Sequence, residues 1–128
     1  MSAGSDTRSL HVALIDPSGY SRPYDHELAR ALVARGHRVT LWTARFVHGD
    51  APEAVGYDAV EHFYPRSNRI PIGSRLRGPA KALEHVSGLA ALWRGLFRDR
   101  PDVVHVQWTV LRPVDRRFYR RLAAGHAR

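Results

Sequence analysis

Residues 24–41 read YDHELARALVARGHRVTL, and this stretch decides the fold. Its first half predicts a helix over residues 24–35, because apolar side chains recur there on one stripe. These side chains are Tyr24, Leu28, Ala31 and Leu32. Pro23 stands just before the helix and Gly36 just after it, which are the positions where these residues start and stop helices. Residues 39–43, rich in β-branched and aromatic side chains, predict a strand directly after the helix.

Apolar runs on both sides of this stretch predict the remaining elements. We expect strands at residues 10–15, 59–64 and 103–108, and helices at residues 80–97 and about 114–124. The order β-α-β-β-α-β-α predicts an α/β fold, a Rossmann-like parallel sheet of about four strands with helices on both faces. Ligands bind such sheets at the carboxyl ends of the strands. A site is therefore expected among residues 16–24, 44–50 and 109–113.

The helix expected at residues 80–97 has an apolar stripe of its own. The stripe consists of Leu83, Val86, Leu89, Ala90, Trp93, Leu96 and Phe97. Our first interpretation is that this stripe faces the core and that the loop before it is solvated. The alternative is that the helix and the basic residues before it form a membrane-surface element.

The composition is that of one globular domain. The chain has 128 residues, of which 44% are hydrophobic, and we expect a disordered polar tail at residues 1–9 and a single domain over residues 10–128. No apolar run approaches the roughly 18–20 residues of a membrane helix, and the N-terminus lacks the apolar core of a secretory signal. Cysteine is absent, which excludes disulfides, thiol catalysis and cysteine–zinc sites. These features favour a cytoplasmic protein.

Positive charge is concentrated in two segments. The formal net charge is +8, from 20 Lys and Arg against 12 Asp and Glu. Residues 66–81 carry five cations and no acid, and residues 112–128 carry six cations against Asp115 alone. This clustering favours an anionic partner, such as a phosphate group, an acidic lipid surface or a nucleic acid. A basic nucleic-acid-binding protein is one alternative, although the sequence has no recognised binding motif of that kind.

The loop at residues 16–24 is the first candidate for ligand binding. It leads into a helix N-terminus, where free backbone N–H groups favour an anion, and it contains Ser and Tyr hydroxyls and Arg22. Its single glycine, Gly19, matches neither the dinucleotide-binding nor the Walker fingerprint. We interpret Asp25 as a helix-start residue. The eight histidines are scattered, so we expect no metal site and no cofactor, and no complete catalytic set can be assigned from spacing.

Two motifs resemble the opening of a family 4 glycosyltransferase of the GT-B fold. The first is LA-x-x-L-x-x-x-G-H-x-V-T at residues 28–40, and the second is PDVVHVQW at residues 101–108. The likeness spans about residues 10–122. It implies the N-terminal, acceptor-side domain of an enzyme that moves a sugar from a nucleotide-sugar donor to an acceptor, with strand order 3-2-1-4. It also implies that the donor is held by a C-terminal domain beyond this chain, so we expect a truncated domain that is inactive alone.

The resemblance also implies where ligands are contacted. In that family the loop after the first strand approaches the donor phosphates, and this loop corresponds here to Ser18, Gly19 and Tyr20. We expect these three residues, with Tyr24 and His105, to bind substrate. The glycine pair found in many members is reduced to Gly19 alone.

Partners are expected on two surfaces. The outer edge of the strand at residues 103–108 would lack a neighbour, which favours a dimer or a partner chain there. The basic segments favour an anionic bilayer that carries a lipid-linked acceptor, so the protein would be peripheral at the inner face of the membrane. A second alternative to the enzyme is a standalone binding or assembly module for a phosphorylated ligand or a partner chain.

Overall fold

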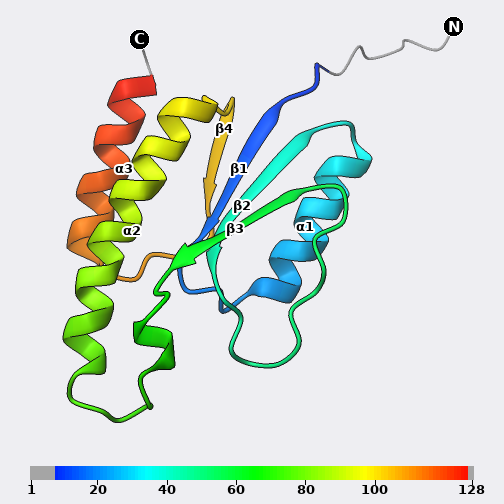
Figure 1. The fold of residues 1–128 in the computed structure, drawn as a ribbon. Helices are drawn as coiled ribbons and strands as arrows, with labels where there is room; N and C mark the ends of the chain where they lie inside the picture. The colour runs from blue at the N-terminus through cyan, green and yellow to red at the C-terminus, as the bar shows by residue number, and fades with distance from the viewer. Residues whose placement is uncertain (1–7, 127–128) are drawn as a thin grey trace, which may run out of the picture.

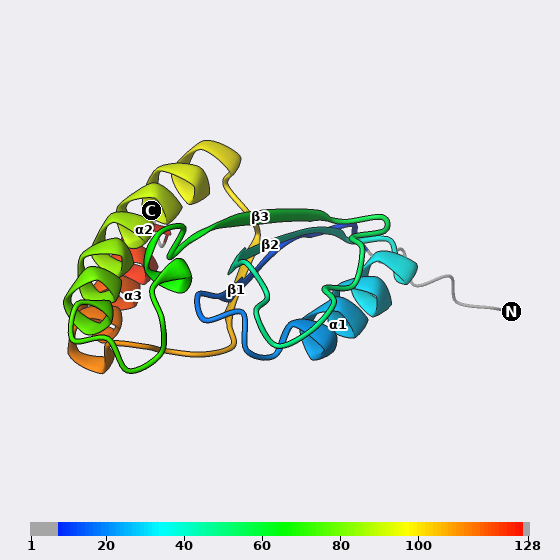
Figure 2. The same cartoon turned by 60° about the horizontal axis from the view of Figure 1, so that its bottom comes forward.

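The computed structural model describes residues 8–126, which form a sheet between two layers of helix (Figures 1 and 2). The predicted order of strands and helices is confirmed. The elements are β1 (His11–Asp16), α1 (Arg22–Ala34), β2 (Arg38–Ala44), β3 (Asp58–Phe63), the short 3-10 helix η1 (Ser67–Arg69), α2 (Arg77–Asp99), β4 (Val103–Val106) and α3 (Arg112–His126).

The four strands are parallel and lie in the order β3-β2-β1-β4, which confirms the Rossmann-like α/β prediction. β1 is central: Leu14 pairs with Leu41 of β2 on one side and with His105 of β4 on the other. Within the described residues β4 has β1 as its sole neighbour, so its outer edge is open there. The partner expected on that edge stays a prediction.

The predicted tail at residues 1–9 falls outside the described residues, apart from Arg8 and Ser9. Ser9 Oγ donates a hydrogen bond to the carbonyl of Gly36 at 2.6 Å, and Arg8 Nη2 lies 3.4 Å from Asp102 Oδ1. Residues 127 and 128 of the predicted domain also lie outside the described part.

Each face of the sheet has its own core, beneath the helix layers that Figure 2 shows from the side. Because strand side chains alternate, β1 contributes Val12 and Leu14 to the α1 face and Ala13 and Ile15 to the face under α2 and α3. All four are buried, and the helices therefore cover both sides of the central strand. Burying a side chain such as Leu14 stabilises the fold by about 1.5–3 kcal/mol.

The face of α2 that packs on the sheet differs from the one predicted. Leu89 and Leu96 are buried as expected, but Leu83, Val86, Ala90 and Phe97 are exposed, and Leu83 retains 74% of its accessible surface. The core-facing prediction is therefore wrong for these four residues. The residues that α2 does bury are His85, Gly88, Leu89, Leu92, Gly95 and Leu96.

Two glycines explain why α2 packs on the sheet through a face that differs from the predicted apolar stripe. A Cβ at Gly88 would lie 2.5 Å from Cδ1 of Phe63, and one at Gly95 would overlap the indole ring of Trp42. The rings from β3 and β2 therefore pack directly against the backbone of the helix. An apolar stripe cannot reveal such a contact, because glycine contributes no side chain to the pattern.

We predict that Gly95→Ala destabilises the protein by about 1–3 kcal/mol, because the added methyl forces the Trp42 ring out of its position. The matched control is Gly78→Ala in the first turn of α2, where a Cβ meets nothing within 4 Å. There alanine should stabilise the helix by about 0.5–1 kcal/mol. Urea unfolding followed by circular dichroism measures both. Equal stability of the two variants would contradict this packing.

Candidate functional site

A pocket of about 520 Å³ opens at the carboxyl ends of β2 and β3. One wall comes from the loop after β2, and the other from the end of β3 and from η1. The lining residues are Arg45, Phe46, Val47, Gly49, Glu61, Phe63, Tyr64, Pro65, Asn68 and Arg69. The pocket includes much of residues 44–50, one of the three segments expected to form a site.

Glu61 is held in the pocket by a buried arginine from the opposite layer of the fold. Arg22, the first residue of α1, donates from Nη2 to Glu61 Oε1 at 3.1 Å, and its side chain is only 3% exposed. A buried guanidinium needs a carboxylate partner, so this pair fixes the position of Glu61. Nε and Nη1 of Arg22 have no partner among the described residues.

Exposed arginines give the pocket positive charge. Arg45 and Arg69 line opposite walls, and both are exposed to solvent. Together with Glu61 they provide two guanidinium groups and one carboxylate in one concavity. Guanidinium groups bind phosphate or carboxylate through paired hydrogen bonds, and a carboxylate accepts hydrogen bonds from hydroxyl groups.

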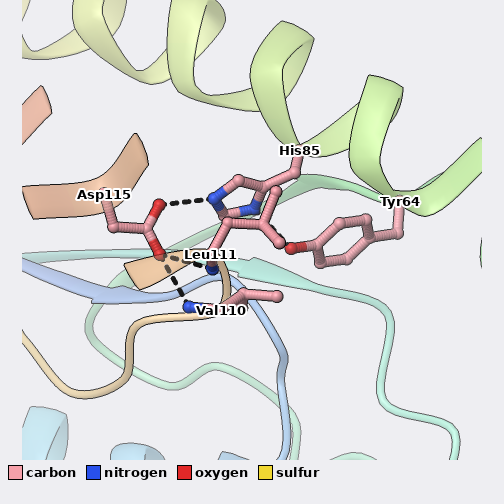
Figure 3. Close-up of polar contacts among 5 residues, drawn as sticks. All are labelled: Tyr64, His85, Val110, Leu111 and Asp115. Carbon is pink, nitrogen blue, oxygen red and sulfur yellow. Dashed lines mark hydrogen bonds and ion pairs between the residues drawn. The ribbon is translucent and has the colours of Figure 1, made fainter. Parts of the chain in front are cut away.

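Tyr64 forms part of the wall and is held by a buried hydrogen-bond network (Figure 3). Its φ of 52° is in the left-handed region, a conformation that costs a non-glycine residue of order 1–3 kcal/mol. The hydroxyl lies 2.5 Å from His85 Nδ1, and His85 Nε2 lies 2.5 Å from Asp115 Oδ1. All three side chains are buried.

The hydroxyl of Tyr64 keeps its proton in this network. Burial and the charge of Asp115 raise the pKa of Tyr64 well above its ordinary value, and the hydroxyl forms a hydrogen bond with Nδ1 of His85. Nε2 of His85 forms a second hydrogen bond, with Oδ1 of Asp115.

Asp115 connects this network to the loop after β4. Its Oδ2 accepts hydrogen bonds from the backbone N–H groups of Val110 at 2.7 Å and Leu111 at 2.9 Å, which lead into α3 (Figure 3). The network therefore joins the end of β3, the middle of α2 and the start of α3. Because its side chains are buried, its role is to position the pocket wall rather than to contact a ligand.

Asp16, the last residue of β1, organises the loop that contains Ser18, Gly19 and Tyr20. One carboxylate oxygen accepts from Ser18 Oγ at 2.7 Å and from the N–H of Gly19 at 3.2 Å. The other accepts from the N–H and hydroxyl of Ser21, both at 3.2 Å. Four hydrogen bonds to one buried carboxylate thus fix the loop before α1.

Gly19 allows this loop to lie against the end of β2. Its φ is +64°, and a Cβ there would lie 2.9 Å from the carbonyl oxygen of Ala44. Tyr20, the next residue, is exposed, and its ring contacts that of His48 edge-to-face with centroids 5.5 Å apart. His48 also contacts Phe46 of the pocket, so the loop borders the pocket without lining it.

The structure brings together three of the five predicted binding residues, Ser18, Gly19 and Tyr20. Tyr24 lies in the first turns of α1 and is exposed. His105 is exposed on β4, in register with Leu14, and is separated from the pocket by β1 and β2. None of the five lines the pocket, and their binding roles stay predictions.

Asp25 has a role beyond the start of α1. It is fully buried, its Oδ1 lies 3.5 Å from Ser21 Oγ, and Oδ2 has no partner within the described residues. Burial, followed by hydrogen bonding with Asp16 and the charge of Asp16, raises the pKa of Asp25 from 3.8 to about 8. At neutral pH this carboxyl is therefore largely protonated.

Sequence reasoning missed several residues of this site. Arg45 falls in a segment where a site was expected, and Arg69 in the basic segment 66–81. Glu61 and Tyr64 were not singled out. The network residues His85 and Asp115 lie 30 positions apart, so no spacing motif could join them. The available signal was Asp115 near the start of a predicted helix, where an acid commonly caps the backbone.

The comparison with protein families gives a clear result. The sequence profile of Glycosyltransferase Family 4 matches residues 24–124, so the chain belongs to Glycosyltransferase Family 4. This confirms the resemblance carried by residues 28–40 and 101–108. No curated protein and no solved structure matches the chain.

Two features are absent from residues 8–126, the part of the chain that the structure describes. No helix there is long and apolar enough to cross a membrane. In the same part of the chain, no three His, Asp or Glu side chains come together as metal ligands would.

We predict that Asp25→Asn makes stability less dependent on pH. Below pH 4 the Asp25 carboxyl is protonated in both the folded and the unfolded protein. As pH rises toward 8, only the unfolded state releases the proton, so the wild type loses stability until the folded pKa is passed. Because one pKa unit is worth 1.36 kcal/mol, the variant should be more stable than the wild type by about 2 kcal/mol or more at pH 8.5.

Urea unfolding at pH 4.5, 6.5 and 8.5 tests this prediction. The control is Glu27→Gln, an exposed acid of the same helix. Parallel stability profiles for the wild type and Asp25→Asn would show that Asp25 is ionised in the folded protein.

Proposed function

We propose that this domain binds the acceptor of a sugar-transfer reaction in the pocket at the ends of β2 and β3. Membership of Glycosyltransferase Family 4 supports the transfer of a sugar. The observation that carries the acceptor assignment is the combination of Glu61 with Arg45 and Arg69 in one concavity. A carboxylate suits sugar hydroxyls and arginines suit an anionic substituent, so the proposed acceptor is a polyol or sugar bearing a phosphate or carboxylate.

The donor is proposed to lie across the loop between β1 and α1, which borders the pocket. Ser18, Gly19 and Tyr20 precede the N-terminus of α1, where the helix dipole favours the phosphates of a nucleotide sugar. Tyr24 and His105 are proposed as further contacts from exposed positions on the same domain. A domain that holds the acceptor and contacts only the phosphates of the donor cannot align both reactants, so we propose that transfer requires a second, donor-binding domain.

The test is an NMR titration of the isotope-labelled chain with glucose 6-phosphate and, as a neutral match, glucose. Glucose 6-phosphate should shift the backbone amides of Arg45, Phe46 and Asn68, and glucose should shift them far less. Arg45→Gln with Arg69→Gln should weaken binding of glucose 6-phosphate by about tenfold or more, because charge-assisted hydrogen bonds are lost.

Arg30→Gln with Arg35→Gln is the matched control. Both arginines are exposed; Arg30 lies in α1, and Arg35 directly follows the helix. This control should bind glucose 6-phosphate like the wild type. Equal binding of glucose and glucose 6-phosphate, or shifts confined to residues 18–21, would contradict the acceptor assignment.

A further inference from the structure

Two basic segments border the outer surface of the α2 and α3 layer. Arg66, Arg69 and Arg75 are exposed in the segment that leads into α2, and Figure 1 shows this segment at the bottom of that helix. α3 lies beside α2 in both views, and it exposes Arg116 and Arg120 together with three further arginines of the same helix.

Few acids lie near these cations, and those present already have hydrogen-bond partners. Residues 66–98 contain Glu84 as their single acid, and Glu84 accepts the backbone N–H groups of Arg66 and Ser67. α3 contains Asp115, which is buried and bound to His85. The cations of the 66–81 segment and of α3 far outnumber these two carboxylates, so the surface keeps a net positive charge.

Large apolar side chains are exposed among the same cations. Ile72 is 89% exposed and Leu76 73% exposed in the loop between η1 and α2, with Arg75 between them. Leu83 and Val86 continue this apolar surface along α2. Core packing does not account for these four side chains, since each has more than half of its accessible surface exposed.

A groove between α2 and α3 extends the apolar surface. It has a volume of about 590 Å³, and Val86, Trp93, Val114 and Phe118 are among its lining residues. Arg117 and Arg121 lie on its α3 side. The surface thus alternates apolar side chains, which favour a hydrocarbon environment, with guanidinium groups, which favour anions.

The charge of this surface decides between possible occupants. A second copy would bring the same arginines against themselves, and like charges in an interface oppose association. A nucleic acid would use the arginines but leave Ile72, Leu76 and the groove in water. An anionic bilayer suits both the arginines and the apolar side chains. Its phosphates accept hydrogen bonds from arginine, and its interfacial acyl region accommodates aliphatic side chains.

We propose that the surface formed by the 66–81 segment, α2 and α3 docks on an anionic lipid bilayer, with Ile72 and Leu76 inserted below the phosphates. This docking surface is separate from the pocket proposed for the acceptor, apart from Arg69, which borders both. The variants that test it therefore leave Arg69 unchanged.

Co-sedimentation of the chain with 100 nm vesicles tests the proposal. Vesicles of equal parts phosphatidylcholine and phosphatidylglycerol should bind the chain at least tenfold more tightly than pure phosphatidylcholine. Arg116→Gln with Arg120→Gln should weaken binding to the anionic vesicles by on the order of 20-fold, because each interfacial arginine contributes about fivefold. Ile72→Ser with Leu76→Ser should weaken the binding that survives 0.5 M salt.

The control is again Arg30→Gln with Arg35→Gln, which removes the same charge from α1 on the other side of the sheet. It should bind vesicles like the wild type. A loss equal to that of the α3 variant would mean that net charge alone drives binding. Wild-type binding by the Ile72/Leu76 variant in high salt would exclude insertion, and tighter binding to duplex DNA than to anionic vesicles would assign the surface to nucleic acid. Each of these results would overturn the proposal.

Discussion

The buried contact between His85 and Asp115 is the interaction on which the shape of the candidate site depends. It links α2 to α3, and through Tyr64 and the N–H groups of Val110 and Leu111 it reaches the end of β3 and the loop between β4 and α3. A buried polar network stabilises a structure only when every member has its partner. Its removal would release the strained Tyr64 backbone and the loop before α3 together.

An ion pair between the buried Arg22 and Glu61 supports the same pocket from the opposite face of the sheet. Arg22 of α1 holds Glu61 of β3. Together with the His85–Asp115 network of α2 and α3, this places residues from both helix layers around the carboxyl ends of the strands. The pocket proposed for the acceptor thus depends on tertiary contacts across the sheet, whereas the loop after β1 is fixed locally by Asp16. This division matches the two proposed roles, with a preformed acceptor pocket beside a short loop for the donor.

The fold could be predicted because its signals are local. The apolar stripe of residues 24–35, the stop at Gly36 and the buried strands define the elements, and the family resemblance adds the strand order. The orientation of α2 could not be predicted, because Gly88 and Gly95 make its contact with Phe63 and Trp42 by having no side chain. The same limit applies to the site: Arg22 and Glu61 are 39 residues apart, and Tyr64 and His85 are 21 apart.

Hydrogen–deuterium exchange of the wild type and of His85→Leu, in buffer where both remain folded, tests the dependence of the site on this network most directly. The amides of Arg66, Ser67, Val110 and Leu111 should lose protection together in the variant, while those of Leu14 and Leu41 in the central strands keep theirs. Unchanged protection at Val110 and Leu111 would contradict the positioning role of the network. Uniform loss along the whole chain would contradict it equally, because His85 would then stabilise the fold without shaping the site.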